Sequence, residues 1–250
     1  MPWMAQPRGN DMKLLSFNSD AKTIKSNAAG TEYLTAILYL APANSVPGIN
    51  VCAMAELAGC IKACLYNAGR AAIFPAIHAA RRKKTEFYRD DQKGFMLQLK
   101  KEVAAFQKKA SKLGKLAAIR LNGTSDIPWE NIPTDSGLSL MADFPDIQWY
   151  DYTKLPGRRV PSNYHLTASY SEANQAYASK VSKTAHNIAV VFRTKSLPET
   201  FLGRRVISGD STDLRFLDEK NVVVGLYAKG TAKKDSSGFV VDYSRMIARG

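Results

Sequence analysis

The sequence predicts an α/β protein with a parallel sheet, and three observations lead to this fold class. Short apolar runs without clean alternation recur along the chain, which is typical of parallel strands covered on both faces. A long amphipathic helical region separates the second run from the third. Several runs end in polar clusters, as strands do in a (β/α) barrel or an open α/β sheet. Because the connections after residue 120 are short for full helices, we expect a partial or irregular (β/α) barrel.

One domain is expected over residues 14–243. The chain has 250 residues, of which 45% are hydrophobic, and this is enough for one large core. Residues 1–13 are predicted to form a flexible N-terminal arm, and residues 244–250 a C-terminal tail. The arm lacks the apolar core of a signal peptide, and no apolar run approaches the roughly 20 residues that span a membrane. We therefore expect a cytoplasmic protein with reduced thiols and no membrane partner.

The first half of the chain is predicted to contain two strands and two helices. A short strand is expected over Lys13–Phe17, and Tyr33–Leu40, rich in β-branched and aromatic residues, predicts a buried strand. Helices are expected over Ala71–Arg89 and about Gly94–Lys112. In the second of these, apolar residues recur at steps of three and four.

Further strands are expected after this helical region, with one helix over Glu172–Val181 between them. The runs that predict strands are Ala117–Leu121, Ile147–Lys154, Tyr164–Glu172, Ile188–Phe192 and Val222–Ala228. The polar clusters at or near strand ends are Asn122–Asp126, Asp151–Lys154, Thr167–Ser169, Asp210–Asp213 and Lys229. In a parallel sheet these clusters meet at one edge.

All three cysteines lie in one segment after the strand Tyr33–Leu40, with the spacing C-x7-C-x3-C: Cys52, Cys60 and Cys64. An odd number of cysteines always leaves one unpaired, so a disulfide framework is excluded. Thiolate is the soft ligand of zinc and of iron–sulfur centres. A helix beginning near Gly59 would carry Cys60 and Cys64 on one face. Three ligands leave one coordination position free for water or substrate.

Two other interpretations of the cysteines stay open. His78, fourteen residues after Cys64, would complete a Cys3His zinc site. Free cysteines are also often small buried hydrophobic residues without any ligand.

The net charge of +13, from 35 Lys and Arg against 22 Asp and Glu, suggests nucleic acid or a nucleotide phosphate as partner. A solvated cationic surface is the alternative. The pairs Arg158-Arg159 and Arg204-Arg205 are candidate phosphate clamps, and the run Arg81–Lys84 adds to the basic surface.

Isolated polar and aromatic residues carry further hypotheses, each with a structural alternative. His165 shares a strand face with Thr167 and Ser169 and is a candidate proton donor, or a residue that is only hydrogen-bonded. Asp210 and Asp213 could bind a divalent cation or make turn bonds. The aromatic residues that could stack bases or fill the core are Trp129, Trp149, Tyr150 and Tyr152. The chain lacks the motifs of P-loop nucleotidases, zincins and α/β-hydrolases.

The cysteine segment resembles that of the radical S-adenosylmethionine enzymes, in which three cysteines after the first barrel strand hold a [4Fe-4S] cluster. The spacing usual there is C-x3-C-x2-C, and Tyr66 is a loose match to an aromatic residue beside the last cysteine. The run from Asn122 to Pro128 resembles the element that holds the methionyl amine, with Asp126 in the acidic position.

This resemblance implies a radical-SAM-like barrel and assigns roles to the residues. Cys52, Cys60 and Cys64 would ligate the cluster. The residues expected to bind S-adenosylmethionine are Asn122, Gly123, Thr124, Ser125 and Asp126. Those expected to face the substrate are Asp151, Lys154, His165 and Ser169.

The chain as a whole resembles a phage and plasmid family, known as the gene-product-eighty-eight domain, over roughly residues 14 to 243. The runs that carry the resemblance include LSFNSDAKTIK, YLTAILYLAPAN, RLNGTSDIPWE and NYHLTASYSE. It implies a mobile-element origin and supplies no established activity. The leading hypothesis is therefore an iron–sulfur enzyme acting on nucleic acid or a nucleotide. The alternative is a non-enzymatic nucleic-acid-binding protein with a structural zinc.

Overall fold

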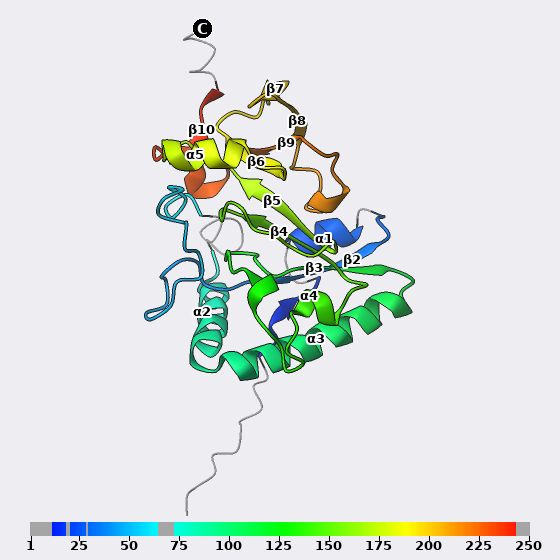
Figure 1. Cartoon of the computed structure of the whole chain (residues 1–250). Helices are drawn as coiled ribbons and strands as arrows, with labels where there is room; N and C mark the ends of the chain where they lie inside the picture. Colours follow the sequence, from blue (N-terminus) through cyan, green and yellow to red (C-terminus); the bar gives the residue numbers. More distant parts are fainter. Residues whose placement is uncertain (1–11, 19–20, 29, 65–72, 244–250) are drawn as a thin grey trace, which may run out of the picture.

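The computed structural model describes residues 12–18, 21–28, 30–64 and 73–243 (Figure 1). Tyr66 and the C-terminal tail over 244–250 lie outside the described residues, as does all of the N-terminal arm except Met12 and Lys13.

A ten-stranded sheet, in the order β1-β2-β3-β4-β5-β6-β9-β8-β7 with β10 paired to β6, runs through the molecule. The strands are β1 Leu15–Ser16, β2 Tyr33–Leu38, β3 Leu116–Arg120, β4 Gln148–Thr153, β5 Tyr164–Ser169, β6 Asn187–Phe192, β7 Thr200–Phe201, β8 Arg204–Ser208, β9 Val223–Tyr227 and β10 Val240–Val241. Among the strands of the described residues, only the edge strands β1 and β7 pair antiparallel, and the other pairs are parallel.

The predicted α/β class with a mostly parallel sheet is confirmed, whereas closure into a barrel is not. Strands β2 to β6 lie side by side in chain order, without the reversal of order found in a doubly wound sheet. In the described part of the chain the sheet ends at β1 and β7, so it is open.

Two long helices cover the outer face of the first half of the sheet. These are α2 (Pro75–Asp90) and α3 (Gln92–Lys112), at the bottom of Figure 1. The apolar stripe of α3 is buried against β2 and β3, as its periodicity predicts. The helix α5 (Gln175–Ser182) covers the second half through Tyr177 and Val181. The remaining helices are α1 Ala21–Ala28, α4 Leu140–Asp143 and the 3-10 turns η3 Trp129–Asn131, η4 Arg215–Leu217 and η5 Gly230–Lys234.

The segment after β8 crosses the other face of the sheet. Phe216 in this segment packs its ring against Tyr33 of β2 and Tyr150 of β4, at centroid distances of 4.8 and 5.3 Å. Leu214 is fully buried against Ala118 and Tyr150. The segment after β8, which belongs to the second half of the sheet, thus covers one face of β2, β3 and β4 in the first half. It lies towards the amino-terminal side of these strands.

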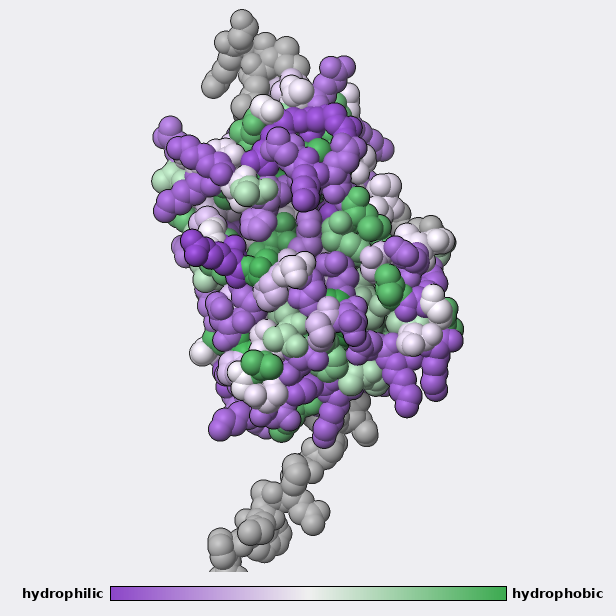
Figure 2. Space-filling view, turned by 45° about the vertical axis from the view of Figure 1, so that its right-hand side comes forward, coloured by the Kyte–Doolittle hydropathy of each residue, from purple (hydrophilic) through white to green (hydrophobic). Residues whose placement is uncertain are grey.

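The surface shown in Figure 2 is mostly hydrophilic, with small hydrophobic groups between the polar side chains. Among the described residues no helix combines the length and apolar character needed to cross a bilayer.

Candidate functional site

A pocket of about 560 Å³ lies at the carboxyl ends of the parallel strands, where α/β proteins place their sites. We call it the cysteine pocket because Cys52, Cys60 and Cys64 all line it. Its other lining residues include Arg120, Asn122, Gly123, Thr124, Ser125, Tyr152, Lys154, Ser169, Asp210, Asp213, Tyr227, Lys229 and Phe239. All five predicted polar clusters therefore contribute residues to one cavity, the third through Ser169.

The cysteine segment is bonded to the loop after β3. The backbone N–H of Asp126 donates to the carbonyl of Val51 at 2.8 Å, and the Cys52 thiol lies 3.6 Å from the carbonyl of Thr124. The Thr124 hydroxyl donates to the carbonyl of Leu40, just beyond β2. These bonds bring two segments that are 72 residues apart in the chain to the same wall of the pocket.

Gly59 ends a helical turn rather than beginning a helix, so the predicted helix from Gly59 through Cys60 to Cys64 is wrong for these described residues. Gly59 has φ +66°. Its N–H donates to the carbonyl of Glu56, and that of Cys60 to the carbonyl of Ala55. This pair of bonds with glycine in the left-handed conformation is a Schellman motif. Cys60 and Cys64 reach the pocket from turns.

The three thiols do not converge on a point. Among the described residues no group of three or more His, Cys, Asp and Glu side chains is placed to hold a single metal ion. Burial raises the pKa of the Cys52 thiol to about 12, so the thiol is neutral without a ligand. His78, the proposed fourth zinc ligand, lies on α2 and is absent from the pocket lining.

Asn122 organises the loop that carries the predicted cofactor-binding residues. Its side-chain oxygen accepts hydrogen bonds from Ser125, the Ile127 N–H and the Trp129 indole at 2.8 to 3.1 Å. At the next position, a Cβ on Gly123 would lie 2.7 Å from the carbonyl oxygen of Leu38. Glycine is therefore required for the close approach of this loop to β2.

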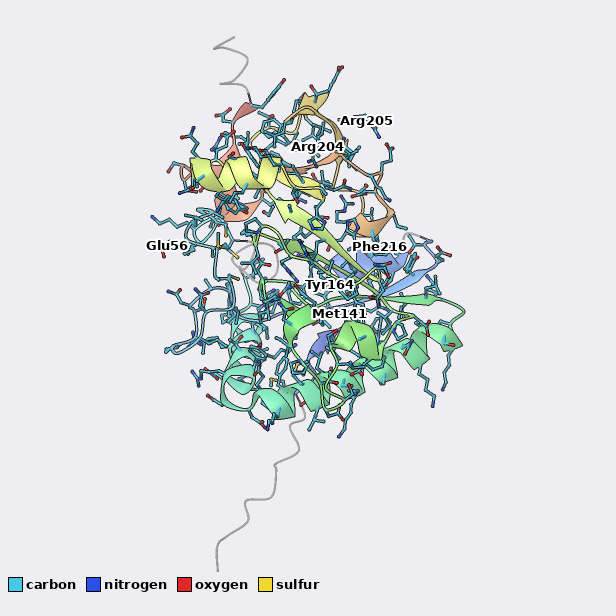
Figure 3. The ribbon with its side chains drawn as sticks, viewed as in Figure 1. Glu56, Met141, Tyr164, Arg204, Arg205 and Phe216 are labelled. Atoms are coloured by element: carbon cyan, nitrogen blue, oxygen red, sulfur yellow. The ribbon has the colours of Figure 1, made fainter. Side chains whose placement is uncertain are left out.

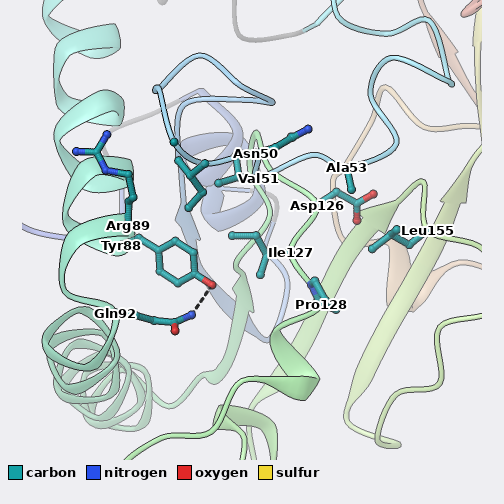
Figure 4. A pocket seen from close by; sticks show the side chains of 12 residues that line it. Asn50, Val51, Ala53, Tyr88, Arg89, Gln92, Asp126, Ile127, Pro128 and Leu155 are labelled. Carbon is teal, nitrogen blue, oxygen red and sulfur yellow. Dashed lines mark hydrogen bonds between the residues drawn. The ribbon is translucent and has the colours of Figure 1, made fainter.

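Asp126 is absent from the lining of the cysteine pocket. Its carboxylate accepts hydrogen bonds from the Thr153 hydroxyl at 2.8 Å and the Lys154 N–H at 2.6 Å, and pairs with Arg158 at 3.4 Å. It lines a second cavity of about 600 Å³ between α2 and residues 48–53 (Figure 4). The structure thus places Asp126 where it fixes the carboxyl end of β4.

Asp151 lies beneath the pocket, in a buried ionic network, and not in its lining. Its carboxylate accepts hydrogen bonds from the Asn122 N–H and the Tyr164 hydroxyl, each at 2.8 Å, and lies 3.5 Å from Arg120. Burial raises its pKa to about 6 against the influence of Arg120. Arg158 extends the network to Tyr164 and Glu130; Tyr164 is labelled in Figure 3.

Of the residues predicted to face a substrate, Lys154 and Ser169 line the cysteine pocket and His165 does not. His165 shares the strand face of Ser169, but four residues of a strand separate them by about 13 Å. Its ring nitrogen lies 3.4 Å from the Thr167 hydroxyl. Burial, with smaller effects from His186 and Arg215, lowers its pKa to about 4.

Sequence reasoning did not assign Arg120 to the site, although it lines the cysteine pocket. Asp213 pairs with the buried Arg120 at 2.8 Å, and Asp210 with Lys229 at 2.6 Å. The Arg120 guanidinium also lies 4.8 Å from the ring centre of Tyr152. One sequence signal was available: Arg120 lies two positions before Asn122, so strand alternation places both on one face.

The other sequence candidates have structural partners. Arg158 and Arg204 bond to groups of their own chain, and Arg205 pairs with Glu219. Trp129, Trp149 and Tyr150 are core residues with at most 1% exposure, so only Tyr152 of that group reaches the pocket.

The fold and site define an α/β protein with a polar, cysteine-lined pocket at the carboxyl ends of its parallel strands. The sequence profile of the Gene product 88 family matches residues 13–243, and the chain belongs to this family. No curated protein and no solved structure matches the chain.

Proposed function

We propose that the protein is an iron–sulfur enzyme whose three cysteines hold a [4Fe-4S] cluster in the cysteine pocket. The observation that carries the proposal is the meeting of Cys52, Cys60 and Cys64 with the loop after β3 and with Lys154 in one cavity. Such a cavity has the position and the size, between about 300 and 1,000 Å³, of a small-molecule site.

The three cysteines line one cavity, and thiolate is the ligand type that a [4Fe-4S] cluster takes. A tetrahedral zinc needs its ligands to converge within about 2.3 Å of one point, and the described donors do not. A cluster is several ångströms across and takes each thiolate at a different iron. When bound, it would supply one-electron chemistry, while the protein contributes position and exclusion of water.

The rest of the pocket would hold a small cofactor or substrate. S-adenosylmethionine, implied by the resemblance to radical enzymes, would lie against Gly123, Thr124 and Ser125, because Asp126 is already bound by other groups. Aromatic rings and cations, such as Tyr152 and Lys229, suit a nucleotide-sized ligand. The pocket volume favours a free nucleotide or a single flipped base over a duplex.

The test is the iron content of Cys60→Ala and His78→Ala variants prepared anaerobically. We expect Cys60→Ala to lose iron at least tenfold with an unchanged far-ultraviolet circular dichroism spectrum, because the cluster loses a ligand. His78→Ala is the matched control and keeps its iron.

Unchanged iron in Cys60→Ala contradicts the proposal. Zinc that is present in the parent protein and lost in both variants would favour the Cys3His site instead. S-adenosylmethionine is tested separately, by its cleavage in reduced, cluster-loaded protein. Absence of cleavage removes this cofactor and leaves the cluster in place.

A further inference from the structure

Lys154 and Ser169 lie side by side in the lining of the cysteine pocket. Thr153 of β4 pairs with Ala168 of β5 in a parallel ladder, so the next residues, Lys154 and Ser169, are neighbours where the two strands end. The backbones of neighbouring strands are about 4.8 Å apart. The ammonium and the hydroxyl are therefore within reach of one small ligand group.

Neither side chain has a polar partner in the described part of the chain. The Lys154 ammonium has no carboxylate within ion-pair distance and no hydrogen-bond acceptor there, although Arg120 and Lys229 in the same pocket each pair with an aspartate. The Ser169 hydroxyl makes no hydrogen bond to these residues either, although Ser169 is only 8% exposed. A buried polar group without a partner costs free energy, which a ligand that bonds to it recovers.

The position and the charge of Lys154 favour a negatively charged ligand. Its backbone N–H donates to the Asp126 carboxylate at 2.6 Å, and its ammonium nitrogen lies 5.9 Å from the ring centre of Phe239. Burial opposes the charge, but Cys60 and Asp126 are among the groups that raise the pKa of Lys154 above its ordinary value. The ammonium is therefore charged at neutral pH and suits a carboxylate or a phosphate.

The pocket wall beside Ser169 is apolar. Ser169 pairs with Ala189 of β6, and Val191 lies two positions further along the same strand and so on the same face. Ala189, Val191 and Phe239 all line the pocket. A ligand with its charged group at Lys154 and Ser169 would place its other atoms against this wall, where burial of apolar surface is favourable.

We propose that the cysteine pocket binds a small organic anion, whose carboxylate or phosphate contacts Lys154 and Ser169 and whose apolar part packs against Ala189, Val191 and Phe239. The inference goes beyond the proposed function, because it requires neither a cluster nor a metal ion. Carboxylate and phosphate oxygens both accept hydrogen bonds from an ammonium and a hydroxyl, so the two head groups are separated by experiment.

The experiment measures the binding of three probes that share a phenyl group to the whole chain by ligand-observed nuclear magnetic resonance. The probes are phenylacetate, phenyl phosphate and the neutral phenylacetamide. We expect at least one anion to bind about tenfold more tightly than the amide, because a hydrogen bond to a charged group is worth about 1.5 to 3 kcal/mol. The anion that binds more tightly identifies the head group.

Lys154→Met should weaken binding of that anion about tenfold and leave the amide unchanged, because it removes the charge and keeps a side chain of similar length. Ser169→Ala should weaken the anion about fivefold, as the loss of one hydrogen bond does. Lys108→Met is the matched control. It removes one exposed charge on α3, outside the pocket lining, and keeps the parent affinity.

Absence of binding of both anions up to about 10 mM, or equal affinity for the anions and the amide, overturns the inference. Equal losses in Lys154→Met and Lys108→Met overturn it too, since only net charge would then matter. If circular dichroism shows that Lys154→Met does not fold, Ser169→Ala decides, and unchanged anion binding in that variant overturns the inference. A protein without iron that binds the anion contradicts the proposed function alone, and an iron-containing protein that does not bind it contradicts this inference alone.

Discussion

At the scale of single residues, burial decides which side chains can exchange protons. His165 has the residue type of a proton donor, but with a pKa of about 4 its ring is neutral at pH 7. Asp151 is held by hydrogen bonds from Asn122 and Tyr164 beside Arg120. Both residues support the structure beneath the pocket rather than line it.

The lowered pKa of His165 predicts a contribution to acid sensitivity. Because the folded-state pKa lies below the usual value of about 6.5, the stability linked to the neutral ring is present above pH 6.5 and is lost as the pH falls towards 4. We expect His165→Gln to lose about 2 kcal/mol less unfolding free energy than the parent protein between pH 7 and pH 4, after allowance for partial exposure. Urea unfolding at both pH values measures this difference. Parallel pH dependence in the two proteins would contradict it.

Residue types predicted which groups gather in the pocket, but not how each is used. The cysteines, Thr124 and Lys154 line it. The carboxylate of Asp126 is instead taken up by Thr153, the Lys154 N–H and Arg158. Whether a carboxylate binds a ligand or neighbouring donors of the protein depends on distances in the folded structure. The spacing of residues in the sequence does not give these distances.

At the scale of elements, strands with strong apolar character were predictable and short edge strands were not. The sequence runs that form β2, β3, β6 and β9 are apolar enough to predict strands from the sequence alone. By contrast β10 has two residues and exists because it continues the ladder of β6 next to Val191 and Phe192. The turn at Gly59 was misread because a glycine in a left-handed conformation ends a helical turn.

Arg204 links the first residue of β8 to the carboxyl end of α5. Its guanidinium donates to the carbonyls of Ser182, Thr184 and His186, all within 3.5 Å. Cations are favourable at this end of a helix, where carbonyls lack intrahelical partners. Arg205, the next residue, is exposed and pairs with Glu219; both arginines are labelled in Figure 3.

This contrast predicts different effects of two neighbouring substitutions. Arg204→Ala leaves three carbonyls without their charged donor, and we expect it to lower the unfolding free energy by about 2 kcal/mol. Arg205→Ala is the matched control and should cost less than about 0.5 kcal/mol, because an exposed ion pair contributes little. Chemical denaturation of both variants measures the difference. Equal losses would mean that Arg204 has no capping role.

At the scale of the whole molecule, fewer cationic side chains are available to bind a polyanion than the net charge suggests. Several basic side chains of α2 donate hydrogen bonds to backbone carbonyls of residues that precede the cysteines in the chain. Arg82 donates to the carbonyl of Ser45, Arg89 to that of Pro47, and the buried Lys84 to that of Leu14 at 2.7 Å. The run predicted to form a basic surface thus partly positions the segment that leads to Cys52. Binding of nucleic acid stays a prediction from charge alone.

The order of strands was not readable from the sequence, although it creates the site. The sheet brings the carboxyl ends of β3, β4, β5, β8 and β9 around one cavity, and the ion pair of Arg120 with Asp213 joins its two sides. Residues 120 and 213 are 93 positions apart, and no local pattern encodes such a contact.

Metal analysis of the anaerobically purified protein decides whether the cysteine pocket holds an iron–sulfur cluster. The measurement is iron, sulfide and zinc per chain together with the ultraviolet–visible spectrum. We expect a brown protein with about four irons and four sulfides per chain, as three-cysteine [4Fe-4S] ligation requires. A colourless protein that neither contains iron nor accepts a cluster on reconstitution would contradict it.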